Sequence, residues 1–363
     1  MFSQATTLQH DHAALLKAQW ALAEAQKQLT PQQLSIIYEQ KWFNIFVPSV
    51  YGGLAMELPE GIRLQEQLAK LDGSVGWTIT LCSGANWFAG FLNNSIVEDF
   101  FSNTRVCFAG SGAPHGIAVS VNDGFIVNGR WAYATGAPHA TAFTANCIIK
   151  QQPNDAGNTV IKSFIFKPEE VTIIYDWNAT GMKATASHSF EVKDLFVSKD
   201  RCFVIDPLHA RINSAIYQFP FLQFAEATLA INICGMATHF MDECKLLFES
   251  KIKNKQYDSL KASEMLGTLD RAVSTIATKR SAFYDILISV WVGGKNENTW
   301  NERGLKDLSI ACIQLAKACI KAVDELYPYC GMTGADESSE INRIWRDIHT
   351  ASQHELLKFI SRH

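Results

Sequence analysis

The sequence lacks the features that mark several classes of protein. No apolar run approaches the roughly 18 uninterrupted residues that a membrane-spanning helix needs. Lys and Arg number 32 against 36 Asp and Glu, so the net charge is −4 and no basic excess favours nucleic acid as a partner. Gly-x-Gly-x-x-Gly units and Walker sequences are also absent, which argues against a phosphate-binding loop. What remains is an ordinary globular composition with 47% hydrophobic residues in a chain long enough for two or three packed units.

Closely spaced cysteine pairs are missing as well. The nine cysteines are scattered, and none forms a Cys-x-x-Cys pair. An odd, unclustered set in a chain without an apolar leader is typical of a reducing compartment. We therefore expect a cytoplasmic protein with free thiols and no metal site.

The composition changes twice along the chain and divides it into three parts. Residues 1–103 are rich in good helix formers, and Thr30-Pro31 is typical of an N-cap followed by proline at the first helical position. Residues 104–206 contain short apolar runs between turn signals, which predicts a β domain. Residues 207–363 return to helical periodicity. Two helices with defined ends are expected here, one from Ser259 to Val292 and a last one from Ser339 to about Ile360.

The segment from Asn122 to Pro138 is the most distinctive part of the β domain. Asp123-Gly124 predicts a tight turn, because glycine tolerates the positive φ of short hairpins. Trp131, Tyr133 and Thr135 then fall on alternate positions, so a regular strand would place two aromatic rings and one hydroxyl on the same side. Such a row can stack on a flat ligand, and it can equally serve as ordinary sheet core.

Several motifs, in this order, resemble those of the acyl-CoA dehydrogenase family. Pro48 with Tyr51-Gly-Gly-Leu54 resembles the family's Pro-x-x-Tyr-Gly-Gly loop, and Gly124 to Arg130 resembles its Gly-Tyr-x-Leu-Asn-Gly-Lys hairpin. Arg343-Ile-Trp-Arg-Asp347 resembles the Arg-x-x-Arg-Asp at the start of the last helix. The resemblance implies an α+β fold with an N-terminal helical domain, a middle β-barrel or sandwich and a C-terminal four-helix bundle. It also implies a homotetramer or homodimer.

The same resemblance implies FAD as cofactor and assigns residues to it. Tyr133 would flank the isoalloxazine, and Thr135 would hydrogen-bond near flavin N5. Gly181 to Ser187 resembles the family's Gly-x-Arg-x-Ser/Thr segment, which adds Ser187 to the site. The Arg-x-x-Phe-Gly segment that holds the flavin pyrophosphate across a subunit boundary is not recognisable, and Arg271 or Arg280 would have to replace it. Backbone groups for the pyrimidine edge would come from Phe108, Ala109, Gly110 and Ser111.

As a dehydrogenase, the chain would catalyse α,β-dehydrogenation of an acyl-CoA thioester and pass electrons to an acceptor. That reaction needs a carboxylate to remove the α-proton while the hydride leaves for the flavin. In many members a glutamate lies eight residues after the Arg-Asp aspartate, which corresponds to Glu355 here. Glu226 and Glu243 are weaker candidates for the base.

Flavin-dependent monooxygenases with the same fold, which receive reduced flavin from a separate reductase, provide the alternative. Gly129-Arg-Trp-Ala-Tyr-Ala-Thr-Gly136 is similar to their Gly-Arg-Trp-x-Phe-x-Ser-Gly, and Trp345-Arg-Asp347 followed by His354 is similar to their Trp-Arg-Asp with a later histidine. This alternative implies FMN or FAD, a small aromatic substrate and His354 as the proton-transferring residue. A third hypothesis is a family member that has lost catalysis and serves in assembly or binding.

Overall fold

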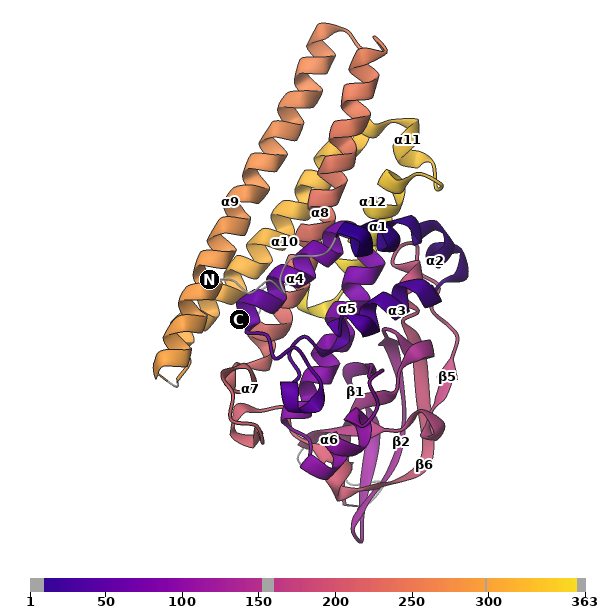
Figure 1. Cartoon of the computed structure of the whole chain (residues 1–363), viewed down its shortest axis with the longest axis vertical. Coiled ribbons are helices and arrows are strands. Elements are labelled where there is room, and N and C mark those ends of the chain that lie inside the picture. The colour runs from indigo at the N-terminus through magenta and orange to yellow at the C-terminus, as the bar shows by residue number, and fades with distance from the viewer. Residues whose placement is uncertain (1–9, 152–159, 298, 358–363) are drawn as a thin grey trace.

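The computed structural model describes residues 10–151, 160–297 and 299–357. Helices make up the first and last thirds of the chain, and a sheet lies between them in sequence (Figure 1). The α+β class predicted from the sequence is confirmed. Among the described residues, no helix is both long enough and apolar enough to span a membrane.

The N-terminal part consists of short helices whose ends follow from local sequence. The Thr30 hydroxyl accepts a hydrogen bond from the Gln33 backbone N–H, as expected for an N-cap. The helix formers from Leu8 to Leu29 predict one continuous helix, but the described part of this segment is broken at Gln19; Leu8 lies outside the described residues. The helices are α1 (His10–Ala18), α2 (Trp20–Gln26), α3 (Pro31–Glu39), α4 (Leu58–Leu71), α5 (Gly73–Asn86) and α6 (Asn94–Phe101).

The middle part is one mixed sheet with the strand order β5-β6-β2-β1-β3-β4-β7. Only β1 and β3 run parallel, and the other pairs are antiparallel. Among the described residues β5 and β7 end the sheet without pairing to each other, so the sheet is not a closed barrel. It curls around one core, because Phe143 of β3 contacts Phe190 of β6 with ring centroids 4.9 Å apart, across two intervening strands. The strands are β1 (Phe108–Val121), β2 (Gly124–Ala134), β3 (Ala142–Lys150), β4 (Val160–Phe166), β5 (Thr172–Ile174), β6 (His188–Ser198) and β7 (Cys202–Phe203).

The C-terminal part is built on three long helices that pack on one another, α8, α9 and α10, with α12 against α8. The apolar positions of α10 repeat at intervals of three and four, and those from Leu308 to Leu326 are buried. On α8, the apolar residues that lie on one face of the helix between Leu229 and Phe240 are buried as well. The helices are α7 (Ala215–Gln218), α8 (Phe221–Lys253), α9 (Ser259–Glu297), α10 (Glu302–Cys330), α11 (Met332–Ala335) and α12 (Glu340–Ala351).

Two predicted helix ends are wrong. Helix α9 continues through Gly293-Gly294 to Glu297, because Gly294 accommodates the Trp300 ring, which a Cβ at that position would meet at 2.0 Å. Helix α12 ends at Ala351 instead of near Ile360, which itself lies outside the described residues. The chain therefore leaves the last helix before His354.

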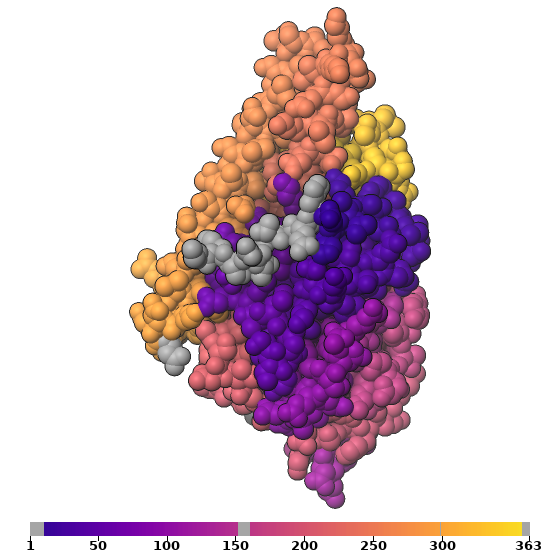
Figure 2. Space-filling model, in the orientation of Figure 1, coloured from indigo at the N-terminus to yellow at the C-terminus, as the bar shows by residue number. Residues whose placement is uncertain are grey.

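The N-terminal helices lie between the bundle and the sheet on the face shown in Figure 2. They share one hydrophobic core with the bundle, whereas the sheet has a second core of its own. Trp87 joins the N-terminal part to the bundle: its ring stacks on Phe224 of α8 with centroids 4.9 Å apart. Its indole N–H donates to the Ile216 carbonyl.

A buried ion cluster connects all three parts of the chain. Arg343 on α12 donates to Asp72, the N-cap of α5, at 2.8 Å and lies 3.5 Å from Asp347. Asp347 in turn accepts a hydrogen bond of 2.5 Å from the Met182 backbone N–H, in the segment between β5 and β6. Both carboxylates and the guanidinium are buried. A single buried guanidinium therefore lies between two buried carboxylates, and it also lies 3.5 Å from the half-buried Glu340.

This arrangement changes the protonation of Asp347. Burial raises the pKa of the Asp347 carboxyl to about 7, the Arg343 charge opposes the shift, and the nearby Asp72 charge adds to it. The ordinary value for aspartate is 3.8, so the folded protein holds a proton that the unfolded chain releases between these two pH values. Because the native state binds more protons in this window, stability should fall as the pH rises from about 4 to about 7.

We expect Asp347→Asn to remove this pH dependence. The wild-type free energy of unfolding should decline by about 1 kcal/mol per pH unit between about pH 5 and pH 7 relative to the variant, measured by denaturant titration. Asp270→Asn makes the same chemical change on an exposed part of α9 and serves as control. A difference in stability between wild type and variant that stays constant between pH 5 and pH 7 would show that Asp347 is charged throughout this range.

Candidate functional site

The end of strand β2 departs from regular geometry. Between the pairs Trp131–Phe190 and Ala134–His188, β2 advances three residues while β6 advances two, which is a β-bulge. Tyr133 lies in this bulge with φ of 66°, a left-handed conformation that costs a non-glycine residue roughly 1–2 kcal/mol. Such strain is often found at functional sites.

The bulge corrects the predicted row of side chains. Trp131 is fully buried in the sheet core, whereas Tyr133 is 74% exposed and contacts Trp177 edge-on at 6.2 Å. Thr135, two residues later, is buried again. Trp131 and Tyr133 therefore do not share one side, because the extra residue interrupts the alternation. An exposed aromatic pair beside a buried hydroxyl remains.

Three hydroxyl groups meet at this point. Thr135 Oγ1 lies 2.9 Å from Ser187 Oγ, which lies 2.7 Å from Thr185 Oγ1. The Thr185 hydroxyl is also 2.9 Å from the Met182 carbonyl oxygen. The structure thus brings together Thr135 and Ser187, which the sequence assigned to one site, and adds Thr185 between Ser187 and the backbone.

The direction of this hydrogen-bond chain follows from its last member. A carbonyl oxygen can only accept, so Thr185 donates its single proton to Met182. Either oxygen of the other two pairs can donate; in the arrangement in which Thr185 donates to Met182, Ser187 donates to Thr185 and Thr135 donates to Ser187. The Thr135 hydroxyl proton is therefore used inside the protein. Toward a ligand, Thr135 Oγ1 presents only lone pairs and is an acceptor.

The start of β1 provides an unpaired strand edge. The described pairing of β1 with β2 begins only at Ile117 and Asn128, so the first residues of β1 pair with β3 alone. Phe108 directs its N–H to the Asn86 side chain at 2.7 Å, away from β3. Backbone groups alternate sides along a strand, so we infer that Gly110 also directs its N–H and C=O away from β3, whereas Ala109 and Ser111 face it.

The candidate proton-transfer residues follow α12. His354 is half-buried, its ring lies edge-on to Trp77 of α5 at 5.9 Å, and its Nδ1 accepts a hydrogen bond from the Leu356 N–H. A neutral imidazole that accepts at Nδ1 carries its proton on Nε2, where it can be donated. Glu355 is exposed at the start of a short 3-10 turn.

The other carboxylates considered as bases contact groups within the protein. Glu226 is buried and accepts a hydrogen bond of 2.5 Å from Ser309. Glu243 lies 3.6 Å from Lys17 and 3.7 Å from His239. Both lie on α8, within the bundle. Their polar contacts are those expected of structural residues.

The two arginines considered for the flavin pyrophosphate have different environments. Arg280 donates to both carboxylate oxygens of buried Glu66, at 2.5 and 2.7 Å, and Tyr284 donates to the same carboxylate. Arg271 is exposed on α9 and bonds to Thr268 of its own helix. Arg280 is thus engaged within its own chain, and Arg271 remains the arginine available to a neighbouring molecule.

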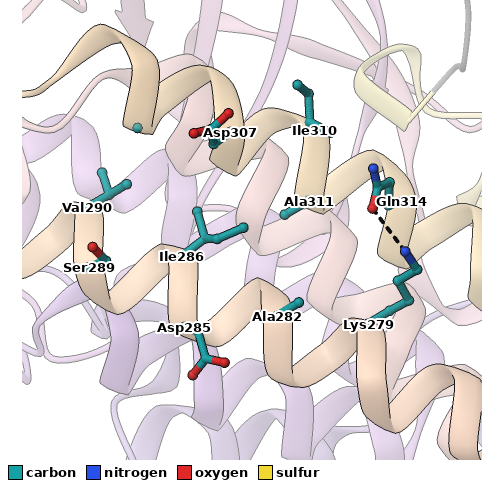
Figure 3. Close-up of a pocket in the computed structure, with 11 residues that line it drawn as sticks. Lys279, Ala282, Asp285, Ile286, Ser289, Val290, Asp307, Ile310, Ala311 and Gln314 are labelled. Atoms are coloured by element: carbon teal, nitrogen blue, oxygen red, sulfur yellow. Dashed lines mark hydrogen bonds between the residues drawn. The ribbon is translucent and has the colours of Figure 1, made fainter.

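A groove lies between α9 and α10 in the bundle (Figure 3). It has a volume of about 460 Å³, and Ile286, Val290 and Ala311 lie along it. The hydrogen bond between Lys279 and Gln314 crosses one end. None of the residues that line it belongs to β1, β2 or the segment from Met182 to Ser187, so it is separate from the hydroxyl chain.

Sequence reasoning missed several residues that shape the site. Thr185 was within the recognised motif, so its position was a usable signal. No sequence signal pointed to three further residues, because their roles depend on contacts between distant segments. These residues are Asn86, Trp77 and Trp177.

Comparison with known proteins starts from the C-terminal part. Residues 227–359 match the family model described as "Acyl-CoA dehydrogenase, C-terminal domain". The oxygenase subunit HsaA of a flavin-dependent monooxygenase from Mycobacterium tuberculosis is 24% identical over 349 residues, covering 90% of this chain and 85% of HsaA. Indole-3-acetate monooxygenase from Acinetobacter baumannii is 23% identical, covering 87% of this chain and 80% of its own.

Among solved structures, XiaF from Streptomyces in complex with FADH2 and glycerol superposes with a TM-score of 0.85 at 19% identity. The superposition covers 96% of this chain and 90% of XiaF. The fold is acyl-CoA dehydrogenase-like. This fold places the end of β2 and the start of β1 beside α5, where the hydroxyl chain and the unpaired strand edge were found.

The comparisons overturn the predicted reaction. The relatives that match most of this chain are monooxygenases and not acyl-CoA dehydrogenases, although they share the acyl-CoA dehydrogenase-like fold. The prediction of α,β-dehydrogenation on a CH–CH group was therefore wrong, and with it the assignment of Glu355 as the base for an α-proton. The fold was read correctly, but a fold does not determine its reaction.

Proposed function

We propose that this chain is the oxygenase component of a two-component flavin-dependent monooxygenase that hydroxylates a small aromatic substrate. The observation that carries the proposal is the direction of the hydroxyl chain, which makes Thr135 an acceptor toward a ligand. Reduced flavin carries a proton on N5 and donates there, whereas oxidised flavin accepts at N5. The similarity to HsaA and to indole-3-acetate monooxygenase supports the same function.

The residues around the hydroxyl chain fit a flavin ring. Tyr133 is exposed beside Trp177, and both rings can flank a planar ligand. Gly110 offers an N–H and a C=O from the unpaired edge of β1 to the pyrimidine edge of the ring, with Phe108, Ala109 and Ser111 forming the strand around it. When bound, the reduced flavin supplies the electrons that activate molecular oxygen.

Few groups are available to hold the flavin pyrophosphate, which agrees with a flavin that is delivered by a reductase. Arg280 is held by Glu66, so only the exposed Arg271 remains to meet a cofactor of a neighbouring subunit. A site that holds the ring better than the pyrophosphate suits either FMN or FAD as a diffusible reduced cofactor. A homotetramer or homodimer remains our prediction, because Arg271 would act across a subunit boundary.

His354 is the residue that we assign to proton transfer with the aromatic substrate. Its Nδ1 is held by the Leu356 N–H, so Nε2 carries the exchangeable proton. The edge-on contact with Trp77 orients the ring. Glu355, which is exposed beside it, has no part in this proposal.

The reaction is tested by supplying reduced FAD, heavy-isotope oxygen gas and a panel of phenols and indole carboxylates. Hydroxylated product should contain one heavy oxygen atom and should form only when reduced flavin is present, as measured by mass spectrometry. Oxidised FAD without a reductant is the control. Reduction of protein-bound FAD by an acyl-CoA thioester in the absence of oxygen would contradict the proposal.

Thr135→Val should weaken binding of reduced FAD about tenfold, the scale of one hydrogen bond, and should affect oxidised FAD much less. The substitution keeps the side-chain shape and removes the acceptor. An anaerobic titration followed by absorbance measures both affinities. Thr278→Val is the matched control, since Thr278 bonds only to the Ser274 carbonyl of exposed α9. Equal loss for the two flavin states would rule out the inferred bond direction.

His354→Asn should lower hydroxylation about 100-fold while reduced FAD binds with nearly unchanged affinity, because the substitution removes only the proton-transferring group. The ratio of product formed to oxygen consumed reports this directly. His349→Asn is the control: this histidine lies one turn earlier, beside Asp324 at 3.0 Å. Unchanged coupling in the His354 variant would exclude the assigned role.

A further inference from the structure

Three potential metal ligands from distant segments meet directly behind Thr135. They are Cys82 on α5, Cys107 just before β1 and His139 in the 3-10 turn that follows β2. One ligand atom from each lies within 4.8 Å of the others. No metal site was expected from the sequence, because no two cysteines form a Cys-x-x-Cys pair. The fold brings these three residues together, so their spacing along the chain does not indicate that they are close in space.

The imidazole is directed at the thiols. His139 Nε2 is buried and has no hydrogen-bond partner among the described residues. A Cβ built on Gly136, whose φ is 78°, would lie 2.9 Å from His139 Nε2 and 3.0 Å from Cys82 Sγ, so both atoms face the same point. The ring is fixed by stacking on Phe43, with 5.7 Å between centroids and 20° between planes.

Both cysteines are fully buried, and His139, although half-buried as a residue, has its Nε2 atom buried. The Cys82 thiol lies 3.5 Å from the Thr135 carbonyl oxygen and is also within hydrogen-bonding reach of Cys107 and His139. An orphaned imidazole nitrogen in a buried site is costly unless it has a partner. A bound cation would satisfy it.

We propose that Cys82, Cys107 and His139 bind one Zn²⁺ ion. Two thiolates and one imidazole are a ligand set that zinc prefers, with Zn–S near 2.3 Å and Zn–N near 2.0 Å. A tetrahedral ion at those distances holds its ligand atoms roughly 3.5–3.8 Å apart, so the side chains need to close by about 1 Å. The ion is redox-inert and ties α5 to the segments on either side of β1 and β2.

Other close groups in the chain lack this combination. Cys244 and Cys330 are 3.7 Å apart and buried, but among the described residues no imidazole completes a ligand set with them. His239, Glu243 and Glu340 are also near one another. There Lys17 already lies 3.6 and 3.5 Å from the two carboxylates and supplies the positive charge.

The test uses Co²⁺ as a spectroscopic probe for zinc. The full-length protein is stripped with a chelator under reducing conditions and titrated with Co²⁺. We expect one equivalent to give the visible bands and the thiolate charge-transfer absorption of tetrahedral cobalt, and Zn²⁺ to displace it. Elemental analysis of the protein as purified should find zinc close to one ion per chain.

The bands should be lost in Cys82→Ser and in His139→Phe, which keeps a ring against Phe43 but offers no ligand. Cys244→Ser should retain them. The melting temperature and circular dichroism of each variant establish that it is folded, and the His139 substitution is decisive should the Cys82 variant not fold. A wild-type protein without these bands, or a folded His139 variant that keeps them, overturns the proposal. Neither result depends on flavin binding or on hydroxylation.

Discussion

The structure depends on one buried guanidinium. Arg343 lies between Asp72, which begins α5, and Asp347, which holds the backbone at Met182. These residues belong to the N-terminal helices, the last helix and the segment leading into β6. Removing one partner of a buried ion pair commonly costs about 3–5 kcal/mol because the other charge loses its compensation. Here Asp72 would lose its counter-charge and Asp347 its charged neighbour, so this side chain contributes to holding all three parts together.

The same cluster sets the geometry of the candidate site. Asp347 fixes the Met182 N–H, and the Met182 carbonyl then receives both the Trp177 indole N–H and the Thr185 hydroxyl. Trp177 contacts exposed Tyr133, and Thr185 begins the chain of hydroxyls. One peptide segment, held from α12, therefore orients both the aromatic edge and the hydrogen-bonding edge of the site.

Much of the fold could be predicted from the sequence, because helix caps, apolar periodicity and turn residues are local signals. Examples are Thr30, which caps α3, and the repeating apolar positions of α10. Thr135 and Ser187 were assigned to one site through motif resemblance. What could not be predicted depends on contacts across the chain. The Tyr133 bulge is visible only in the pairing with β6, and Gly293-Gly294 failed to end α9 because Trp300 packs against the second glycine.

The reaction was the hardest property to predict, and the hydroxyl chain explains why. A Thr or Ser near flavin N5 is compatible with either flavin state, because a hydroxyl both donates and accepts. The direction of these hydrogen bonds is set only at the other end of the row of hydroxyls, where the Met182 carbonyl can accept but cannot donate. That carbonyl is placed by Asp347, which lies 165 residues away in sequence. In the flavin site that we propose, the flavin state that Thr135 favours is therefore set by a backbone group that no motif contains.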